Sequence, residues 1–131
     1  MSEDRFKAGM AVRRAVLGDV HVDGAERRKT TFDEDFQRFI TEGAWGSVWS
    51  RSGLTRRERS MLTVALLAGL GHWDELAMHI RATKNTGASE EDIKEVLLQV
   101  AVYAGVPAAN KAFKVAKETY AEMMAQEEKK P

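Results

Sequence analysis

The feature that most restricts the fold is a repeat in the second half of the chain. The stretches GLTRRERSMLTVALLAGLG (53–71) and GASEEDIKEVLLQVAVYAG (87–105) align without a gap at an offset of 34 residues. Each begins with glycine and a capping residue, has an acid three residues after that residue, and ends its apolar run with glycine. A second helical pattern follows each stretch. The sequence therefore predicts two copies of a helical hairpin in a bundle, because a solenoid needs at least three repeats.

The same capping residues and glycines set the expected helix limits within the two hairpins. Thr55 and Glu58 form one capping box, and the helix after it runs to about Leu70; it is apolar nearly all round, which predicts the buried centre of the fold. The next helix ends near residues 85–87. Ser89 and Asp92 open a third helix, and Pro107 suits the first turn of a fourth. The inward positions expected on these last two helices are Ile93, Val96, Leu97, Val100, Ala104, Phe113, Ala116, Tyr120 and Met123.

The first half of the chain is predicted to hold two helices and two irregular segments. The first helix carries Phe6, Met10, Arg13 and Leu17 on one side and ends at Gly18. The polar stretch 18–29 reads as a loop with a short helical turn. A capping box of Thr31 and Glu34 opens the second helix, which carries apolar residues at helical spacing (Phe32, Phe36, Phe39, Ile40) and ends at Gly43; 43–54 is an irregular connection. The expectation is a single all-α domain over residues 1–131, with about six helices and a frayed tail from about residue 125.

Composition excludes several classes of function. The chain has 20 basic and 20 acidic residues, so it lacks the positive charge that a nucleic-acid partner requires. It contains no cysteine, which excludes disulfides, zinc–thiolate sites and thiol redox catalysis. The N-terminus lacks the pattern of a signal peptide, and the longest apolar run, 61–70, is too short to cross a bilayer. We therefore expect a cytoplasmic protein that does not enter membranes.

The segment GHWDELAMH (71–79) carries two of the three histidines. A helix places His72, Glu75 and His79 on one face, which is compatible with a metal site, an acid–base pair or a solvated surface pair. The two histidines are seven residues apart, roughly 10 Å between Cα atoms, so they would converge on one ion only with additional ligands. Glu75 is four residues before His79, close enough to orient the imidazole. Spacing alone favours the surface pair.

Other polar and aromatic residues admit two readings each. His21 is either a loop residue or a catalytic acid, and Trp45 and Trp49 either pack to stabilise the fold or line a pocket. Arg51 and the arginines of the following helix start, Arg57 and Arg59, are either solvated charges or carboxylate-binding groups.

Considered together, these segments resemble a known family. The stretches VRRAVLGDVHVD (12–23), FQRFITEGAWGSVWSRSGLTRRERSMLTVALLAGL (36–70), ELAMHIRATKNTG (75–87) and EDIKEVLLQVAVYAGVPAANKAF (91–113) resemble the 4-carboxymuconolactone decarboxylase family. The resemblance implies the AhpD-like helical fold and a homo-oligomer, a trimer or hexamer. In the peroxidase branch of that fold, two cysteines precede a histidine on this helix; His79 matches the histidine, and His72 and Glu75 occupy the cysteine positions.

The resemblance also implies an activity. This family decarboxylates 4-carboxymuconolactone to 3-oxoadipate enol-lactone in the β-ketoadipate (protocatechuate) pathway of aromatic catabolism, with no cofactor and no metal. It implies His79 as the proton donor or oxyanion donor and Glu75 as the group that sets its protonation. By the same reasoning Arg51 binds a substrate carboxylate, His21 is a second acid or carboxylate contact, and Trp45 and Trp49 exclude water.

Two other functions remain open from the sequence. One is a related AhpD-like enzyme that acts on another lactone or keto acid. The other is a non-catalytic helical interaction module, which the hairpin repeat suggests. A cavity lined by His79, Glu75 and an arginine would favour an enzyme.

Overall fold

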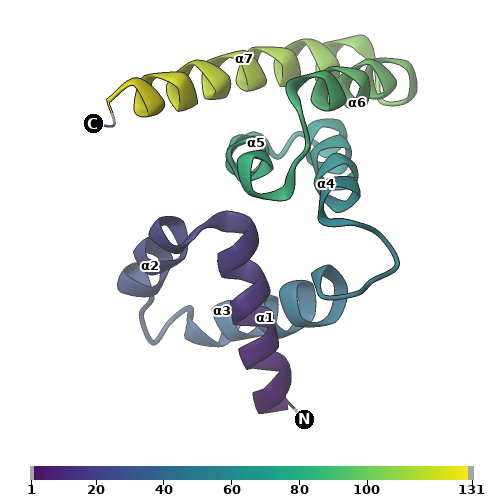
Figure 1. Cartoon of the computed structure of the whole chain (residues 1–131). Helices are drawn as coiled ribbons and strands as arrows, with labels where there is room; N and C mark the ends of the chain where they lie inside the picture. The colour runs from purple at the N-terminus through teal and green to yellow at the C-terminus, as the bar shows by residue number, and fades with distance from the viewer. Residues whose placement is uncertain (1, 130–131) are drawn as a thin grey trace. The chain divides into compact units, whose positions relative to one another are not determined.

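The computed structural model describes residues 2–129, which contain seven α-helices, one π-helix and no strand (Figure 1). Residues up to Arg56 form one compact unit, and residues from Arg57 form the other. The elements are α1 (Ser2–Leu17), α2 (Asp19–Arg28), α3 (Glu34–Ile40), the π-helix η1 (Thr41–Trp49), α4 (Arg56–Leu70), α5 (Trp73–Thr86), α6 (Glu90–Tyr103) and α7 (Val106–Glu128). The all-α prediction is confirmed, and within this range no helix is long and apolar enough to cross a membrane.

In the first unit, α1 crosses η1 at two glycines. A Cβ atom on Gly9 would overlap the carbonyl oxygen of Thr41 and lie 2.9 Å from the backbone nitrogen of Gly46. A Cβ on Gly46 would lie 2.5 Å from the carbonyl oxygen of Arg5. Because neither glycine has a side chain, the two backbones touch. This approach accompanies the burial of one face on each helix: Val12, Arg13 and Val16 of α1, and Thr41, Trp45 and Trp49 of η1.

The expected loop at 18–29 is wrong, because it folds as the ten-residue helix α2. Gly18 ends α1 as predicted, with φ of 93°, and α2 begins at the next residue. Two features stabilise this polar helix. Arg14 of α1 forms ion pairs with Asp19 and Asp23, at 3.1 and 2.9 Å, and the acid-first, base-last order of α2 suits the helix dipole.

The limits of the next helix are also different from those expected. The N-cap of α3 is Asp33, and the local bonds join Thr30 and Asp33 rather than Thr31 and Glu34: the Thr30 N–H donates to Asp33 Oδ1 at 2.8 Å. The phenylalanines that suggested an inward face (Phe32, Phe36, Phe39) are exposed. Gly43 does not end the helix, because the chain continues without a break as η1 to Trp49. The buried positions of η1 recur every four residues (Thr41, Trp45, Trp49), and their burial accounts for the continuation.

In the second unit, the predicted repeat is visible in the backbone. Gly71 and Gly105, 34 residues apart, both have positive φ, 77° and 111°, and each ends a helix of a matched pair, α4 and α6. Ser89 and Asp92 form the predicted capping box, and Pro107 lies in the first turn of α7. The four helices share one apolar core, made by Val64, Ala68, Leu76, Ile80, Ala88, Ile93, Val96, Leu97, Val100, Ala109, Ala112 and Ala116. The inward positions are as predicted except Ala104, which is exposed because it follows the last turn of α6.

The expectation that α4 is buried all round is wrong. Its buried positions are Ser60, Val64 and Ala68, which form one stripe four residues apart. Leu62, Leu66 and Leu70, also four residues apart, are 54%, 62% and 68% exposed. The helix is therefore two-sided: small residues face the core of this unit, and a leucine stripe faces away from it.

Candidate active site

His79 is held inside the second unit by the helix α5. The helix ends at Gly87, a left-handed C-cap with φ of 91° whose N–H bonds to the Thr83 carbonyl oxygen. Its buried side chains recur at helical spacing (Leu76, His79, Ile80, Ala82, Thr83), and α5 packs against α7. His79 is only 7% exposed. The sequence favoured a surface pair at this position, and for the imidazole that interpretation is wrong.

The other two members of the stripe are not buried with His79. His72 is the N-cap residue of α5 and is exposed, and Glu75 lies in the first turn and is also exposed. Among the described residues no group of three or more histidine, cysteine or acidic side chains is arranged to hold a metal ion. The structure thus separates a buried imidazole from two solvated groups.

The remaining predicted site residues belong to the first unit. Trp45 and Trp49 lie on η1 with ring centroids 5.1 Å apart and planes at 36°, and both are buried. His21 lies on α2 and is half-buried. Arg51 follows η1 and is exposed, with its backbone N–H bonded to the Val48 carbonyl oxygen. The two tryptophans are thus the predicted site residues in this unit that the structure brings together.

Arg57 has a structural partner. Its Nε and Nη2 donate to the two carboxylate oxygens of Asp92 at 2.8 and 2.7 Å, which links the start of α4 to the start of α6. The Asp92 carboxylate also accepts from the Ser89 N–H. The Arg57 guanidinium holds the pKa of Asp92 well below its ordinary value. The reading of Arg57 as a carboxylate-binding group is therefore replaced by an internal ion pair.

Arg13 is a charged residue that the sequence analysis did not single out as functional. It is 4% exposed, and it donates to two neutral oxygens: Nη1 to Thr41 Oγ1 at 3.4 Å and Nη2 to Gln37 Oε1 at 3.2 Å. Its buried Nε has no hydrogen-bond partner in the part of the chain that the structure describes. Burial lowers the pKa of Arg13, although Glu26 acts in the opposite direction. The available signal was its place on the apolar face of the first helix.

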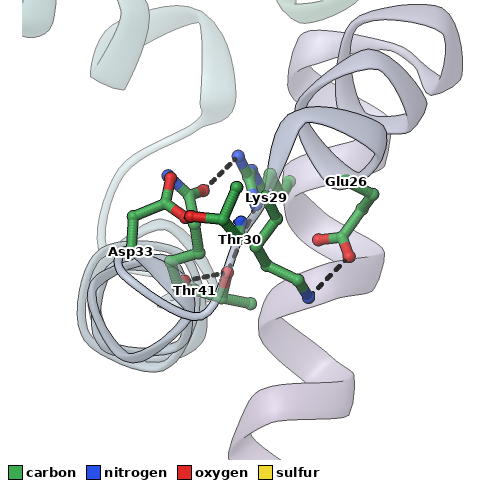
Figure 2. A network of polar contacts seen from close by, with 7 residues as sticks. Glu26, Lys29, Thr30, Asp33 and Thr41 are labelled. Carbon is green, nitrogen blue, oxygen red and sulfur yellow. Dashed lines mark hydrogen bonds and ion pairs between the residues drawn. The ribbon is translucent and has the colours of Figure 1, made fainter.

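A hollow of about 230 Å³ lies beside this arginine. Both of the side chains that accept from Arg13, Gln37 and Thr41, line it, and its other walls come from Phe6, Glu26, Lys29, Glu34, Asp35 and Arg38. Figure 2 shows Thr41 close to the Lys29–Glu26 ion pair, in which Nζ and Oε2 are 2.9 Å apart. A second hollow of about 200 Å³ lies between α6 and α7. Neither hollow is lined by a residue predicted from the sequence as part of the site.

Comparison with known proteins places the chain in a family. Residues 34–118 match the carboxymuconolactone decarboxylase family. The chain belongs to this family. The match begins in α3 and ends in α7, so that it includes η1 with its tryptophan pair and α5 with His79.

Two relatives extend over most of this chain. The 4-carboxymuconolactone decarboxylase of Acinetobacter baylyi is 46% identical over 121 residues, covering 92% of this chain and 90% of the relative. The nitrosuccinic acid decarboxylase of Metarhizium robertsii is 43% identical over 119 residues, covering 91% of this chain and 83% of the relative. A 4-carboxymuconolactone decarboxylase of Pseudomonas putida is 50% identical over 44 residues, which is 34% of this chain and 92% of the relative.

Proposed function

We propose that the protein is a carboxy-lyase that converts 4-carboxymuconolactone to 3-oxoadipate enol-lactone in the β-ketoadipate pathway. The observation that carries this proposal is the 46% identity over nearly the whole of both chains to an enzyme of that activity. The burial of His79 inside a helical bundle supports it, because an imidazole shielded from water is suited to proton transfer.

The reaction consists of one bond cleavage and one proton transfer. The bond between the ring carbon and its carboxylate breaks, and carbon dioxide leaves. The electron pair of that bond passes through the C=C bond to the lactone carbonyl, so the intermediate is a dienolate with its charge on oxygen. A proton then adds to the carbon next to the carbonyl, and the electron pair returns from oxygen to carbon. The enzyme has to bind two carboxylates, stabilise the oxyanion and deliver one proton; no cofactor or metal is needed.

In this proposal His79 donates the proton or donates a hydrogen bond to the oxyanion. Glu75, one helical turn before it, sets the protonation state of the imidazole from the solvated side of α5. Arg51 binds one substrate carboxylate and His21 is a second polar contact. Trp45 and Trp49 form an apolar wall that keeps water from the carboxylate that leaves.

We further propose that residues 1–131 act as one catalytic domain within a cytoplasmic homo-oligomer, a trimer or hexamer. The support is the leucine stripe of α4, because three leucines four residues apart expose an apolar seam of the kind that subunits cover. Leu66→Lys places a charge in the middle of that seam. We expect this variant to have a smaller mass by light scattering than the unaltered protein, and an unchanged mass would contradict the seam.

The proposed activity is tested by mixing the purified protein with 4-carboxymuconolactone and measuring carbon dioxide release. His79→Gln keeps the size and some hydrogen bonding of the side chain but cannot carry a proton, so we expect turnover to fall by about 100-fold or more. His72→Gln is the matched control, because His72 is the exposed N-cap residue of the same helix. A His79→Gln enzyme as active as the control would exclude the proton-donor role.

The relative from Metarhizium robertsii supports a second candidate substrate class. Nitrosuccinic acid is a small dicarboxylic acid in which a nitro group can accept the electron pair left by carbon dioxide, as the lactone carbonyl does. Both substrates thus carry two carboxylates and an electron-accepting group. Parallel assays with the lactone and with nitrosuccinate decide between them: a higher kcat/KM for nitrosuccinate would assign this chain to the second class.

A further inference from the structure

Arg13 presents an incomplete binding geometry. A guanidinium that binds a carboxylate side-on uses Nε and Nη2, as Arg57 does with the two oxygens of Asp92 in this chain. In Arg13 the same two atoms are occupied differently: Nη2 donates to the amide oxygen of Gln37, and the buried Nε has no partner among the described residues. One neutral oxygen therefore occupies half of a site shaped for two anionic oxygens.

The electrostatic state of Arg13 is correspondingly unfavourable. A buried guanidinium is normally compensated by a carboxylate, because removing a charge from water costs several kcal/mol. No carboxylate lies within ion-pair distance of Arg13 in the part of the chain that the structure describes, and its two hydrogen bonds are long and go to neutral groups. Among the described residues of the same unit, Arg14, Lys29 and Arg38 make five half-buried or exposed ion pairs, so acids are abundant nearby but do not reach Arg13.

The hollow beside Arg13 offers a route for an external carboxylate. Gln37 is half-buried, lines the hollow and accepts a hydrogen bond from Arg13. A volume of about 230 Å³ accommodates a small organic acid, since one water molecule takes about 30 Å³. Of the acids in the wall, Glu26 is paired with Lys29, whereas Glu34 and Asp35 are exposed in the first turn of α3, where water and the helix dipole reduce their repulsion.

We infer that this hollow is a subsite for one carboxylate of a small dicarboxylate substrate, bound side-on by Arg13 when the Gln37 side chain moves aside. The incoming carboxylate replaces the amide oxygen at Nη2 and at the same time supplies the missing acceptor at Nε. Two hydrogen bonds to an anionic carboxylate then take the place of one to a neutral amide oxygen, which favours the exchange. The inference rests on the proposed decarboxylation of a dicarboxylate, and it assigns the second substrate carboxylate, beside the one proposed for Arg51, to Arg13.

The binding step is tested with succinate, a dicarboxylate without a group that can react. In nitrogen-15-labelled protein, the Nε–H signal of Arg13 reports directly on the atom that lacks a partner. We expect succinate to move this signal downfield as Nε–H gains an anionic acceptor, and to leave the Nε–H signal of Arg14, the next residue on α1, in place. A signal that does not move at saturating succinate would overturn the inference.

Gln37→Glu is the decisive variant, because it introduces a carboxylate of the same size next to Arg13. We expect the new glutamate to pair with Nε and Nη2, to raise the thermal midpoint, and to block succinate. In the decarboxylation assay KM should rise about tenfold or more, the loss expected for a charge-assisted hydrogen bond. Glu34→Gln, an exposed residue of the same wall, serves as the control and should not raise KM. If Gln37→Glu raises the midpoint and still binds succinate as the unaltered protein does, Arg13 is only a structural residue.

The proposed function and the proposed carboxylate subsite can be rejected independently of each other. Succinate binding at Arg13 without release of carbon dioxide from the lactone or nitrosuccinate would reject the proposed function and keep the carboxylate subsite. Normal turnover with an unchanged KM in Gln37→Glu would keep the function and reject the subsite. Arg13→Met tests the same point if it folds, with Arg14→Met as its matched control, and the glutamine variant decides the question if it does not.

Discussion

Replacing Gly9 by alanine should destabilise the first unit strongly, although alanine is the better helix former. The new Cβ would overlap the Thr41 carbonyl oxygen and lie 2.9 Å from the Gly46 nitrogen, both backbone atoms that cannot rotate away. The helices α1 and η1 must then separate, and a gap of 0.5–1 Å forfeits a quarter to a half of each dispersion contact across the crossing. Overpacking of this kind costs about 1–3 kcal/mol. We expect a net loss of about 3 kcal/mol, the upper end of this range, because the obstructing atoms belong to the backbone. This net loss already includes the gain of about 1 kcal/mol in helix propensity from replacing glycine by alanine.

The assay for Gly9→Ala can be confined to the unit concerned. Trp45 and Trp49 are in the first unit and Trp73 is in the second, so tryptophan fluorescence in a Trp73→Phe background follows the unfolding of the first unit alone in urea. Gly43→Ala is the control, because a Cβ there meets nothing within 4 Å and should be neutral or stabilising by up to about 1 kcal/mol. Equal urea midpoints for Gly9→Ala and Gly43→Ala would refute the close crossing.

Two further predictions concern pH. Burial raises the pKa of Tyr120 to about 12, so its phenolate absorbance should appear well above the usual pH 10. This late titration step should be absent in Tyr120→Phe. Stability should fall as pH rises from about 10 to 12, because the folded state holds the phenol proton more tightly than the unfolded state does. The depressed pKa of Asp92 contributes stability that is complete above about pH 4 and is lost as pH falls through the acid range. Asp92→Asn should therefore flatten the acid limb of the stability profile measured by urea unfolding. An acid limb unchanged in that variant would contradict the Arg57–Asp92 ion pair.

The helices of the second unit were predictable because their ends are set by local chemistry. A glycine with positive φ, as at Gly71 and Gly105, has a backbone conformation that other residues rarely adopt, so a single residue determines where the helix ends. The same holds for Ser89 and Asp92, which cap α6 with bonds that depend only on residues three apart. Signals of this kind do not depend on distant parts of the chain.

The first unit was predicted less well because its elements depend on contacts between neighbouring helices. The stretch 18–29 contains glycine and many charges, which locally favour a loop, yet it is a helix in which Val22 is fully buried and Asp19 and Asp23 pair with Arg14. In the same way, Gly43 looked like a helix stop, but it takes an ordinary negative φ and the helix continues. Glycine is a stop only where the packing permits a left-handed residue, and the sequence does not state the packing.

The candidate site was predictable in part for the same reason. The spacing correctly placed Glu75 and His79 on one helix, whereas His72 is the N-cap residue just before it, and periodicity alone did not reveal that only His79 lies inside the bundle. The reverse case is Arg13: its charge favoured a solvated position, although it shares one side of the first helix with Phe6, Met10 and Leu17, and it is 4% exposed. A charged residue on an apolar stripe is therefore a candidate for a functional test in its own right.

The π-helix η1 connects these observations. Helices with i to i+5 hydrogen bonds are rare and usually a single turn long, and they recur at functional sites. In η1 the wider turn places Thr41, Trp45 and Trp49 on one buried face, and burial of the two indoles and their ring contact compensates for the less favourable backbone. Thr41 is at once the first residue of η1, an acceptor for Arg13 and a wall of the hollow. The junction between α3 and η1 thus fixes Arg13 and begins the tryptophan face, so a change at Thr41 should disturb both together.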